Sequence, residues 1–305
     1  MKIALAGRLL ASTLLLSAVV VSAKRPDPQL LSLVPPDSQI VAGAAAPLEG
    51  GSRGNFLIFT RANTLDLADF FSVVGADASH KVNQVIFAAS AQPGHANLEH
   101  SVLVSGNFDA KQIYRSESTS ATSFYHGVKV IVLRPFERER AFLMQDRWFA
   151  TLDSRLSILG TISSAQEEID RYLSGAAPDT SIVQRLSSLR SADDTWCFIS
   201  SLELGAEIPR VLKDLDPALS DIDEASDTIL FGIRYGRQIE FEYVVNALRG
   251  TDPVPGRLVG SSFNSANRGL SSARDSELSV GTGSRRVVKI SRGRYDRWLE
   301  DLTAH

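Results

Sequence analysis

The sequence is poor in cysteine: Cys197 is the only one in 305 residues. One thiol cannot form a disulfide within the chain, and with no Cys/His set of suitable spacing a zinc site is excluded as well. The remaining composition is unremarkable, with 12 Pro, 21 Gly, 44% hydrophobic residues and a net charge of −3. It excludes collagen-like, disordered and disulfide-scaffold proteins, and the length suggests two domains or one duplicated unit.

The sequence also lacks the local motifs of several enzyme classes. There is no G-x-S-x-G nucleophile turn, no G-x-x-x-x-G-K-[ST] phosphate loop and no H-E-x-x-H zinc pair. The glycine-rich segment 50–54 (GGSRG) has no lysine and does not join a strand to a helix. We interpret it as a surface loop, and we predict no catalytic residue and no cofactor.

Metal ligands are sparse. The five histidines are His80, His95, His100, His126 and His305. His95 and His100 flank Glu99, but neighbouring residues of a strand point to opposite faces, which argues against joint ligation. The acidic segment holding Asp214, Asp216, Asp221, Asp223, Glu224 and Asp227 lacks the glycine of a calcium loop. No metal site is predicted, and we interpret the acidic segment as a solvated loop and His126 as a solvated turn residue.

Long apolar runs are absent except at the N-terminus. Lys2 and Arg8 precede the apolar stretch Leu9–Ala23, which ends in the small-residue sequence Val21-Ser22-Ala23. This pattern predicts a signal peptide over residues 1–23 and export to the periplasm or the exterior. An uncleaved anchor is the alternative, although a membrane-spanning helix needs about 20 residues. A lipoprotein is not expected, because no cysteine follows the run.

The region 24–36 contains several prolines and is predicted to be a linker. Beyond it, strand and helix patterns alternate. In the first half we expect strands at 39–46, 82–89 and 98–104, hairpins over 124–133 and 141–158, and helices over 64–74 and from Ser163 to Gly175. Asp109 is expected to cap a short helix.

The second half restarts the same order. We expect a strand at 194–202, helices over 204–215 and 257–270, a second hairpin within 278–290 and a terminal helix over 295–302. The clearest hairpin joins 228–235 to 238–245. Its residues Ile229, Phe231, Ile233, Phe241 and Tyr243 share one face, which is expected to be buried, while Thr228, Arg234, Gln238, Glu240 and Glu242 share a solvent face. Cys197 is interpreted as a core residue.

These elements predict an α+β fold of two tandem repeats, each a mainly antiparallel sheet covered by helices, over residues 37–190 and 191–305. The arrangement resembles a group of bacterial exported proteins built from duplicated α+β units. The resemblance rests on Pro35-Pro36-Asp37, on the segment 106–109 (GNFD) and on the segment 125–128 (YHGV). It implies fold and export, and no site residues.

Residues 249–297 hold ten basic residues, namely Arg249, Arg257, Arg268, Arg274, Arg285, Arg286, Lys289, Arg292, Arg294 and Arg297. An anionic polymer or another envelope component could bind there, but arginines also protect strand edges and cover apolar surface. Nucleic acid is not expected from an exported acidic protein, and contact with a membrane is expected only through an uncleaved N-terminus.

Three functions remain open. The first is an exported, non-enzymatic binding or envelope-structural protein. The second is a hydrolase or transferase whose catalytic residues converge from distant positions. The third is a carrier of lipid or lipoprotein, which requires an apolar concavity between sheets.

Overall fold

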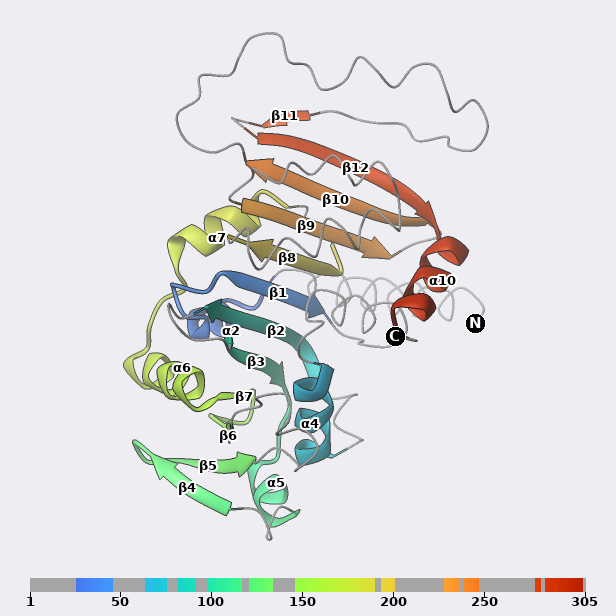
Figure 1. The fold of residues 1–305 in the computed structure, drawn as a ribbon. Helices are drawn as coiled ribbons and strands as arrows, with labels where there is room; N and C mark the ends of the chain where they lie inside the picture. The colour runs from blue at the N-terminus through green and yellow to red at the C-terminus, as the bar shows by residue number, and fades with distance from the viewer. Residues whose placement is uncertain are drawn as a thin grey trace, which may run out of the picture.

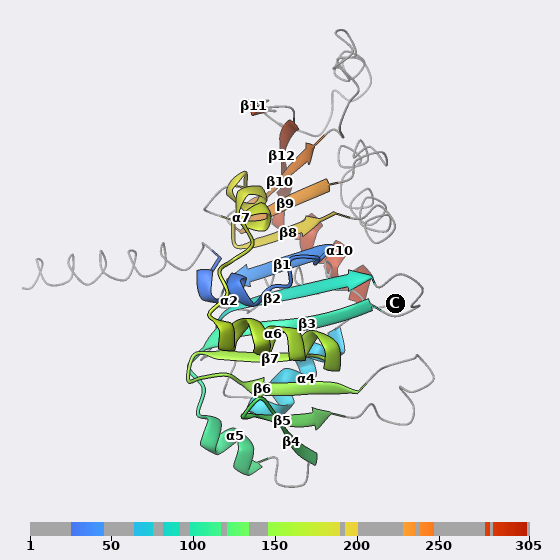
Figure 2. The same cartoon turned by 90° about the vertical axis from the view of Figure 1, so that its left-hand side faces the viewer.

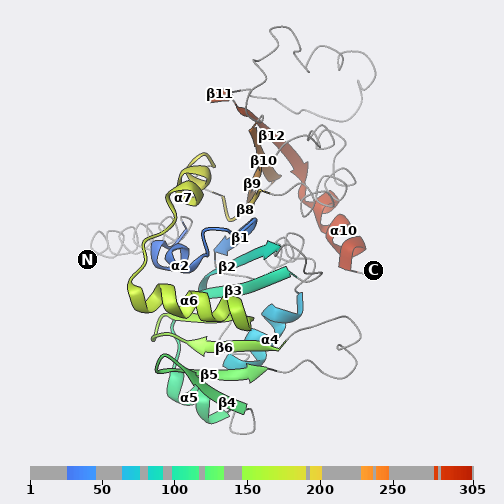
Figure 3. The same ribbon diagram turned by 60° about the vertical axis from the view of Figure 1, so that its left-hand side comes forward.

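The computed structural model describes residues 26–45, 64–75, 82–91, 98–116, 121–133, 146–189, 193–200, 228–235, 238–246, 278–280 and 283–303. These parts form one sheet of twelve antiparallel strands in the order β11-β12-β10-β9-β8-β1-β2-β3-β7-β6-β5-β4 (Figure 1). The sheet twists from β11 to β4 (Figure 3), as large antiparallel sheets do. The predicted signal segment and the predicted helices 204–215 and 257–270 lie outside the described residues.

The strands match most of the predicted ones. Those of the first half are β1 (Ile40–Ala45), β2 (Val82–Ala91), β3 (Leu98–Gly106), β4 (Ala121–Tyr125), β5 (Val128–Leu133), β6 (Arg147–Thr151) and β7 (Leu156–Thr161). Those of the second half are β8 (Thr195–Ile199), β9 (Thr228–Tyr235), β10 (Gln238–Asn246), β11 (Leu278–Val280) and β12 (Gly283–Ser291). The helices are α2 (Pro28–Leu33), α4 (Thr64–Val74), α5 (Ala110–Ser116), α6 (Ile162–Ser174), α7 (Thr180–Ser187) and α10 (Arg292–Thr303).

The two halves of the chain are joined at the centre of the sheet. β1 pairs with β8 from Ile40 opposite Ile199 to Ala44 opposite Thr195. Gly43 lies opposite Trp196, and a β-carbon on Gly43 would come within 2.2 Å of the indole ring. The prediction of two separate sheet repeats covered by helices is therefore wrong, because the backbone hydrogen bonds run without interruption from one half into the other.

The helices pack on both faces of this sheet. α2, α6 and α7 lie on one face, called here the α6 face, and α4, α5 and α10 lie on the other, called the α4 face (Figure 2). The helices that directly follow β7 and β12, α6 and α10, therefore cover opposite faces. If the two halves were copies of one unit, the antiparallel pairing of their first strands would relate them by a two-fold axis perpendicular to the sheet. Such an axis keeps corresponding helices on the same face. An exact duplication does not predict this placement, although the strands run outward from the centre in the same order in both halves, as β1-β2-β3 and as β8-β9-β10.

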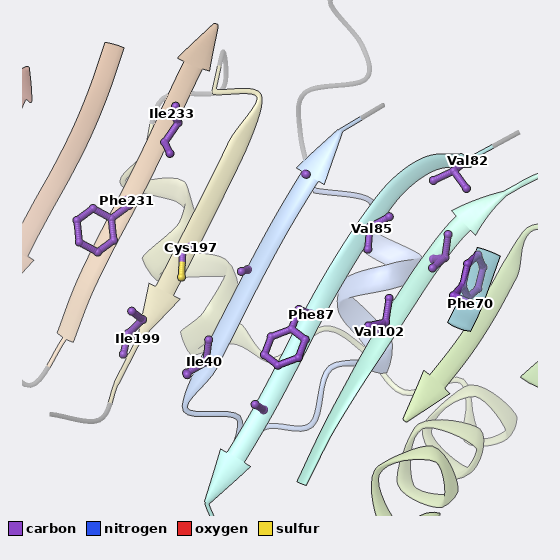
Figure 4. Close-up of a cluster of buried hydrophobic side chains, with 14 of the residues drawn as sticks. Ile40, Phe70, Val82, Val85, Phe87, Val102, Cys197, Ile199, Phe231 and Ile233 are labelled. Carbon is purple, nitrogen blue, oxygen red and sulfur yellow. The ribbon is translucent and has the colours of Figure 1, made fainter. Parts of the chain in front are cut away.

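The α4 face holds an aromatic-rich core. Phe70 of α4 contacts the rings of Phe108 and Phe149 at centroid distances of 6.0 and 5.7 Å. The same core continues across β3, β2, β1, β8 and β9, where Val102, Phe87, Ile40, Cys197 and Phe231 lie on one face (Figure 4). Burial raises the pKa of the Cys197 thiol, so this residue is an inert core side chain, as predicted.

The predicted linker 24–36 is described from residue 26 onward, and this part belongs to the α6-face core instead. Asp27 caps α2 through the Gln29 amide, and Pro28 occupies the first turn, where proline is tolerated. Leu30 and Leu33 are almost fully buried in the same cluster as Ile169 of α6. The prolines of this segment were expected to disfavour a helix. Pro28 instead stands at the start of α2, where proline favours helix formation.

The structure confirms one half of the prediction for the β9–β10 hairpin, the burial of its apolar face. Phe231, Phe241 and Tyr243 are at most 2% exposed, and Tyr295 of α10 contacts Phe241 at a ring distance of 5.9 Å. The opposite face meets solvent only near the turn, where Gln238 is exposed. Further along the hairpin the prediction is wrong, because Glu242 is only 1% exposed and Leu230 is fully buried there. Both faces of the central sheet are therefore covered, which alternation along a strand cannot reveal.

Candidate functional site

A group of hydroxyl and carboxylate side chains lies between α6 and the sheet. Glu99 and Ser101 alternate along β3 and face α6. The hydroxyls of Thr161 and Ser163 donate to the carboxylate of Glu99, and the Ser101 hydroxyl donates to Glu168 of α6. These bonds hold the first turns of α6 on the sheet.

Glu168 is the most unusual member of this group, since it is fully buried. Burial raises the pKa of its carboxyl well above the ordinary value, with a partial opposing effect from the Ser101 hydrogen bond. Its Oε2 atom has no hydrogen-bond partner within the described residues. Burial therefore favours the protonated form of Glu168, which lies enclosed under α6 with no exposed surface.

An exposed cluster lies at the C-terminal half of α6. The Tyr125 hydroxyl donates to Oδ2 of Asp170 at 3.0 Å, and Nε2 of His126 lies 3.8 Å from Oδ1 of the same carboxylate. The Tyr125 ring contacts the rings of His126 and Trp148 at 4.3 and 5.8 Å. We call Tyr125, His126, Trp148 and Asp170 the hairpin surface.

The local sequence explains how the hairpin surface is positioned. His126 and Gly127 form the two-residue turn between β4 and β5, and both have positive φ values, 49° and 85°. These are the angles of a type I′ turn, which follows the twist of a two-stranded ribbon. Glycine adopts such angles readily, and histidine is one of the few other residues enriched at positive φ.

The two aromatic residues of the hairpin surface are half-buried, whereas the ionisable ones are open. The side chains of His126 and Asp170 are 62% and 52% exposed. Loss of solvent and the neighbouring Asp170 carboxylate both raise the pKa of Tyr125, so its hydroxyl keeps its proton and donates to Asp170. The surface thus combines fixed aromatic rings with exposed hydrogen-bonding groups.

The predicted candidate residues fall at different places. Glu99 faces α6, whereas His100 stacks on Phe87 at a ring distance of 6.3 Å, which places it on the α4 face. The two therefore point to opposite faces, as predicted. His126 is an exposed turn residue, also as predicted. The segment 50–54, the acidic segment 214–227, His80, His95 and His305 lie outside the described residues.

The basic region is described only in part. Lys289 forms an ion pair with Glu240 at 3.3 Å, and Arg292 lies 4.0 Å from Asp296. Arg234 of β9 contacts the same Glu240 at 3.0 Å. These contacts favour the structural interpretation of the region, because two of its cations, Lys289 and Arg292, lie against carboxylates of the sheet and of α10.

Within the described residues, no three His, Cys, Asp or Glu side chains come together as ligands for a metal ion. None of the helices in the described ranges has the length and apolar character needed to cross a membrane.

No protein-family model and no curated protein matches this chain. A solved structure, crystal form I of TP0453, is similar to it, with a TM-score of 0.51 and 11% sequence identity. The similarity covers 91% of this chain and 98% of the TP0453 chain. At this identity the likeness concerns the fold alone. The resemblance to duplicated exported proteins stays a prediction.

The hairpin surface contains one motif that the sequence had singled out, the turn 125–128. Sequence reasoning missed its other half, since Asp170 is 45 positions away from Tyr125. No local pattern links the two segments. Only the pairing of β4 through β7 and the path of α6 bring them together.

Proposed function

We propose that this chain is an exported, non-enzymatic binding protein of the cell envelope, and that the hairpin surface takes its ligand. One observation carries the proposal: rings and ionisable groups from β4, β6 and α6 gather on an exposed part of the molecule and are held there by mutual contacts. Aromatic side chains in such positions are typical of binding sites.

The burial of the other polar groups supports binding over hydrolysis. The Ser101–Glu168 pair combines a hydroxyl with a carboxyl, but both side chains are at most 1% exposed. A nucleophile and its base must reach a substrate. In the hairpin surface, the Asp170 carboxylate accepts a hydrogen bond from the Tyr125 hydroxyl. Its Oδ1 atom lies 3.8 Å from Nε2 of His126, which is longer than a hydrogen bond, so Asp170 and His126 do not form a hydrogen-bonded acid–base pair.

The central core supports binding over lipid carriage. A carrier needs apolar side chains that line an open cavity. Phe231 and Phe241, the largest apolar residues of the β9–β10 hairpin, are 0% and 1% exposed. They are packed as core residues.

The chemistry of the hairpin surface fits a saccharide. A sugar ring has apolar C–H faces, which pack on aromatic rings, and hydroxyls at its rim, which bond to carboxylates and imidazoles. Trp148 and Tyr125 supply the rings, and Asp170 and His126 supply the polar groups. For an exported protein, glycans of the cell wall are ligands of this class.

We expect binding of soluble cell-wall fragments or chitotriose in a titration followed by calorimetry or by NMR. Trp148→Ala should weaken the affinity about tenfold or more, because it removes a central ring. Leu173→Ala is the matched control, since Leu173 of α6 is 50% exposed and lies outside the hairpin surface. Absence of binding by either ligand, or equal affinities for the two variants, would refute the assignment.

Export has its own test. The predicted signal peptide places the mature N-terminus near Lys24. N-terminal sequencing of the protein from its native host should therefore begin there, in an extracytoplasmic fraction. An intact Met1 in the cytoplasm would show that the export prediction is wrong, whatever the outcome of the ligand titration.

A further inference from the structure

The edge strand β4 is exposed over its first four residues. It is the terminal strand at one end of the sheet and pairs with β5 in an unbroken register from Ala121 opposite Val132 to Tyr125 opposite Val128. Ala121, Thr122, Ser123 and Phe124 are all exposed, and Phe124 reaches 69%. A large aromatic residue on a bare sheet edge is uncommon in a soluble monomer.

The turn fixes which backbone groups of β4 point outward. A two-residue type I′ turn closes on a hydrogen-bonded pair, here Tyr125 and Val128. Hydrogen-bonded and non-hydrogen-bonded pairs alternate along an antiparallel ladder, so Ser123 and Ala121 also bond to β5. The N–H and C=O groups of Thr122 and Phe124 therefore face away from the sheet.

β4 carries none of the devices that usually protect an edge. Its sequence, ATSFY, has no charge, no proline and no bulge. The opposite edge strand, β11, has only three residues, and a short edge strand is itself a protection. The two ends of the sheet thus differ, and β4 is the one suited to pairing.

We propose that β4 pairs with β4 of a second copy of this chain, which joins the two sheets into one. An antiparallel pair with its two-fold axis at Ser123 sets Thr122 opposite Phe124 of the second copy, so that the outward groups of both residues meet as a hydrogen-bonded pair. Phe124 and its symmetry mate then lie diagonally across the pair, within reach of each other.

The charge pattern of β4 favours a second copy over another partner. In a pair about a two-fold axis, each β4 strand faces an identical β4 strand, so a charged strand would face like charges. The neutral segment ATSFY faces no charge. The contact is one short strand with its neighbouring side chains, less than a standard interface. The dimer should therefore be weak and depend on protein concentration.

Sedimentation velocity of the mature chain over a concentration series tests the pairing. The wild type should shift from monomer to dimer as concentration rises. Thr122→Pro should weaken the dimer at least tenfold, because it removes an outward N–H and leaves the ladder with β5 complete. Phe124→Lys should do the same through charge repulsion. Leu173→Lys, on the exposed side of α6, is the control and should dimerise like the wild type.

Amide exchange provides a second measurement that needs no variant. At concentrations that favour the dimer, the amides of Thr122 and Phe124 should exchange at least tenfold more slowly than in dilute protein, whereas the exposed turn amide of His126 should not change. A wild type that stays monomeric at all concentrations would overturn the proposal. A dimer that survives Thr122→Pro and Phe124→Lys, without protection of these amides, would overturn it as well.

Discussion

Phe241→Ala should lower the free energy of unfolding by about 3–5 kcal/mol, the range measured for large-to-small changes in well-packed cores. Phe241 is 1% exposed, lies between β9 and β12 and contacts the ring of Tyr295. The substitution removes a whole ring from a core that joins the sheet to α10. Urea denaturation of the two proteins at one pH measures the difference.

The matched control is Phe124→Ala, the same change on β4, where the ring is 69% exposed. At a protein concentration low enough to exclude pairing, it should alter stability by no more than about 0.5 kcal/mol. Similar small effects of both substitutions would contradict the buried-core assignment. They would then favour the carrier hypothesis, in which the Phe241 ring lines an open cavity.

Glu168→Gln should become more stabilising as the pH rises. In the folded protein the pKa of Glu168 is raised by burial, whereas in the unfolded chain the carboxyl ionises at its ordinary pKa of about 4.3. Above that pH the folded state binds the extra proton, so the wild type loses up to about 1.4 kcal/mol per pH unit until the folded carboxyl also ionises. Glutamine does not ionise and removes this loss.

Urea titrations between pH 4 and pH 8 measure the effect. The difference between Glu168→Gln and the wild type should be smallest near pH 4 and grow with pH. The control is Glu167→Gln on the outer side of α6, where burial also raises the pKa but to a lesser degree. Parallel stability curves for the wild type and Glu168→Gln would show that the buried carboxyl titrates normally.

Local signals in the sequence predicted the individual elements well. The helix predicted over 64–74 is α4, and Gly175 ends α6 in the left-handed conformation typical of a helix C-terminus. Asp109 accepts bonds from the amides of Lys111 and Gln112, as expected of a helix cap. Periodicity and capping act over a few residues, so a single sequence contains them.

The assembly of these elements depends on distant contacts, and there the predictions were wrong. Pairing of β1 with β8 turned two expected sheets into one. α7 was missed, although Asp179 accepts hydrogen bonds from Ser181 and Ile182 at its start, because its eight residues carry few apolar positions. The hairpin surface was likewise foreseen only at its turn, since Asp170 arrives from another element.

The pairing of β1 with β8 also bears on how the chain reaches its folded state. Ile40 must find a partner, Ile199, that follows roughly 160 positions later, whereas β2 to β7 can assemble among themselves. Contacts of such long range slow folding, because a large loop must close before they form. During synthesis, one side of β1 therefore stays unpaired until β8 has emerged. A chain that completes the centre of its sheet so late exposes an unpaired strand for much of its synthesis, and it needs protection from aggregation for as long.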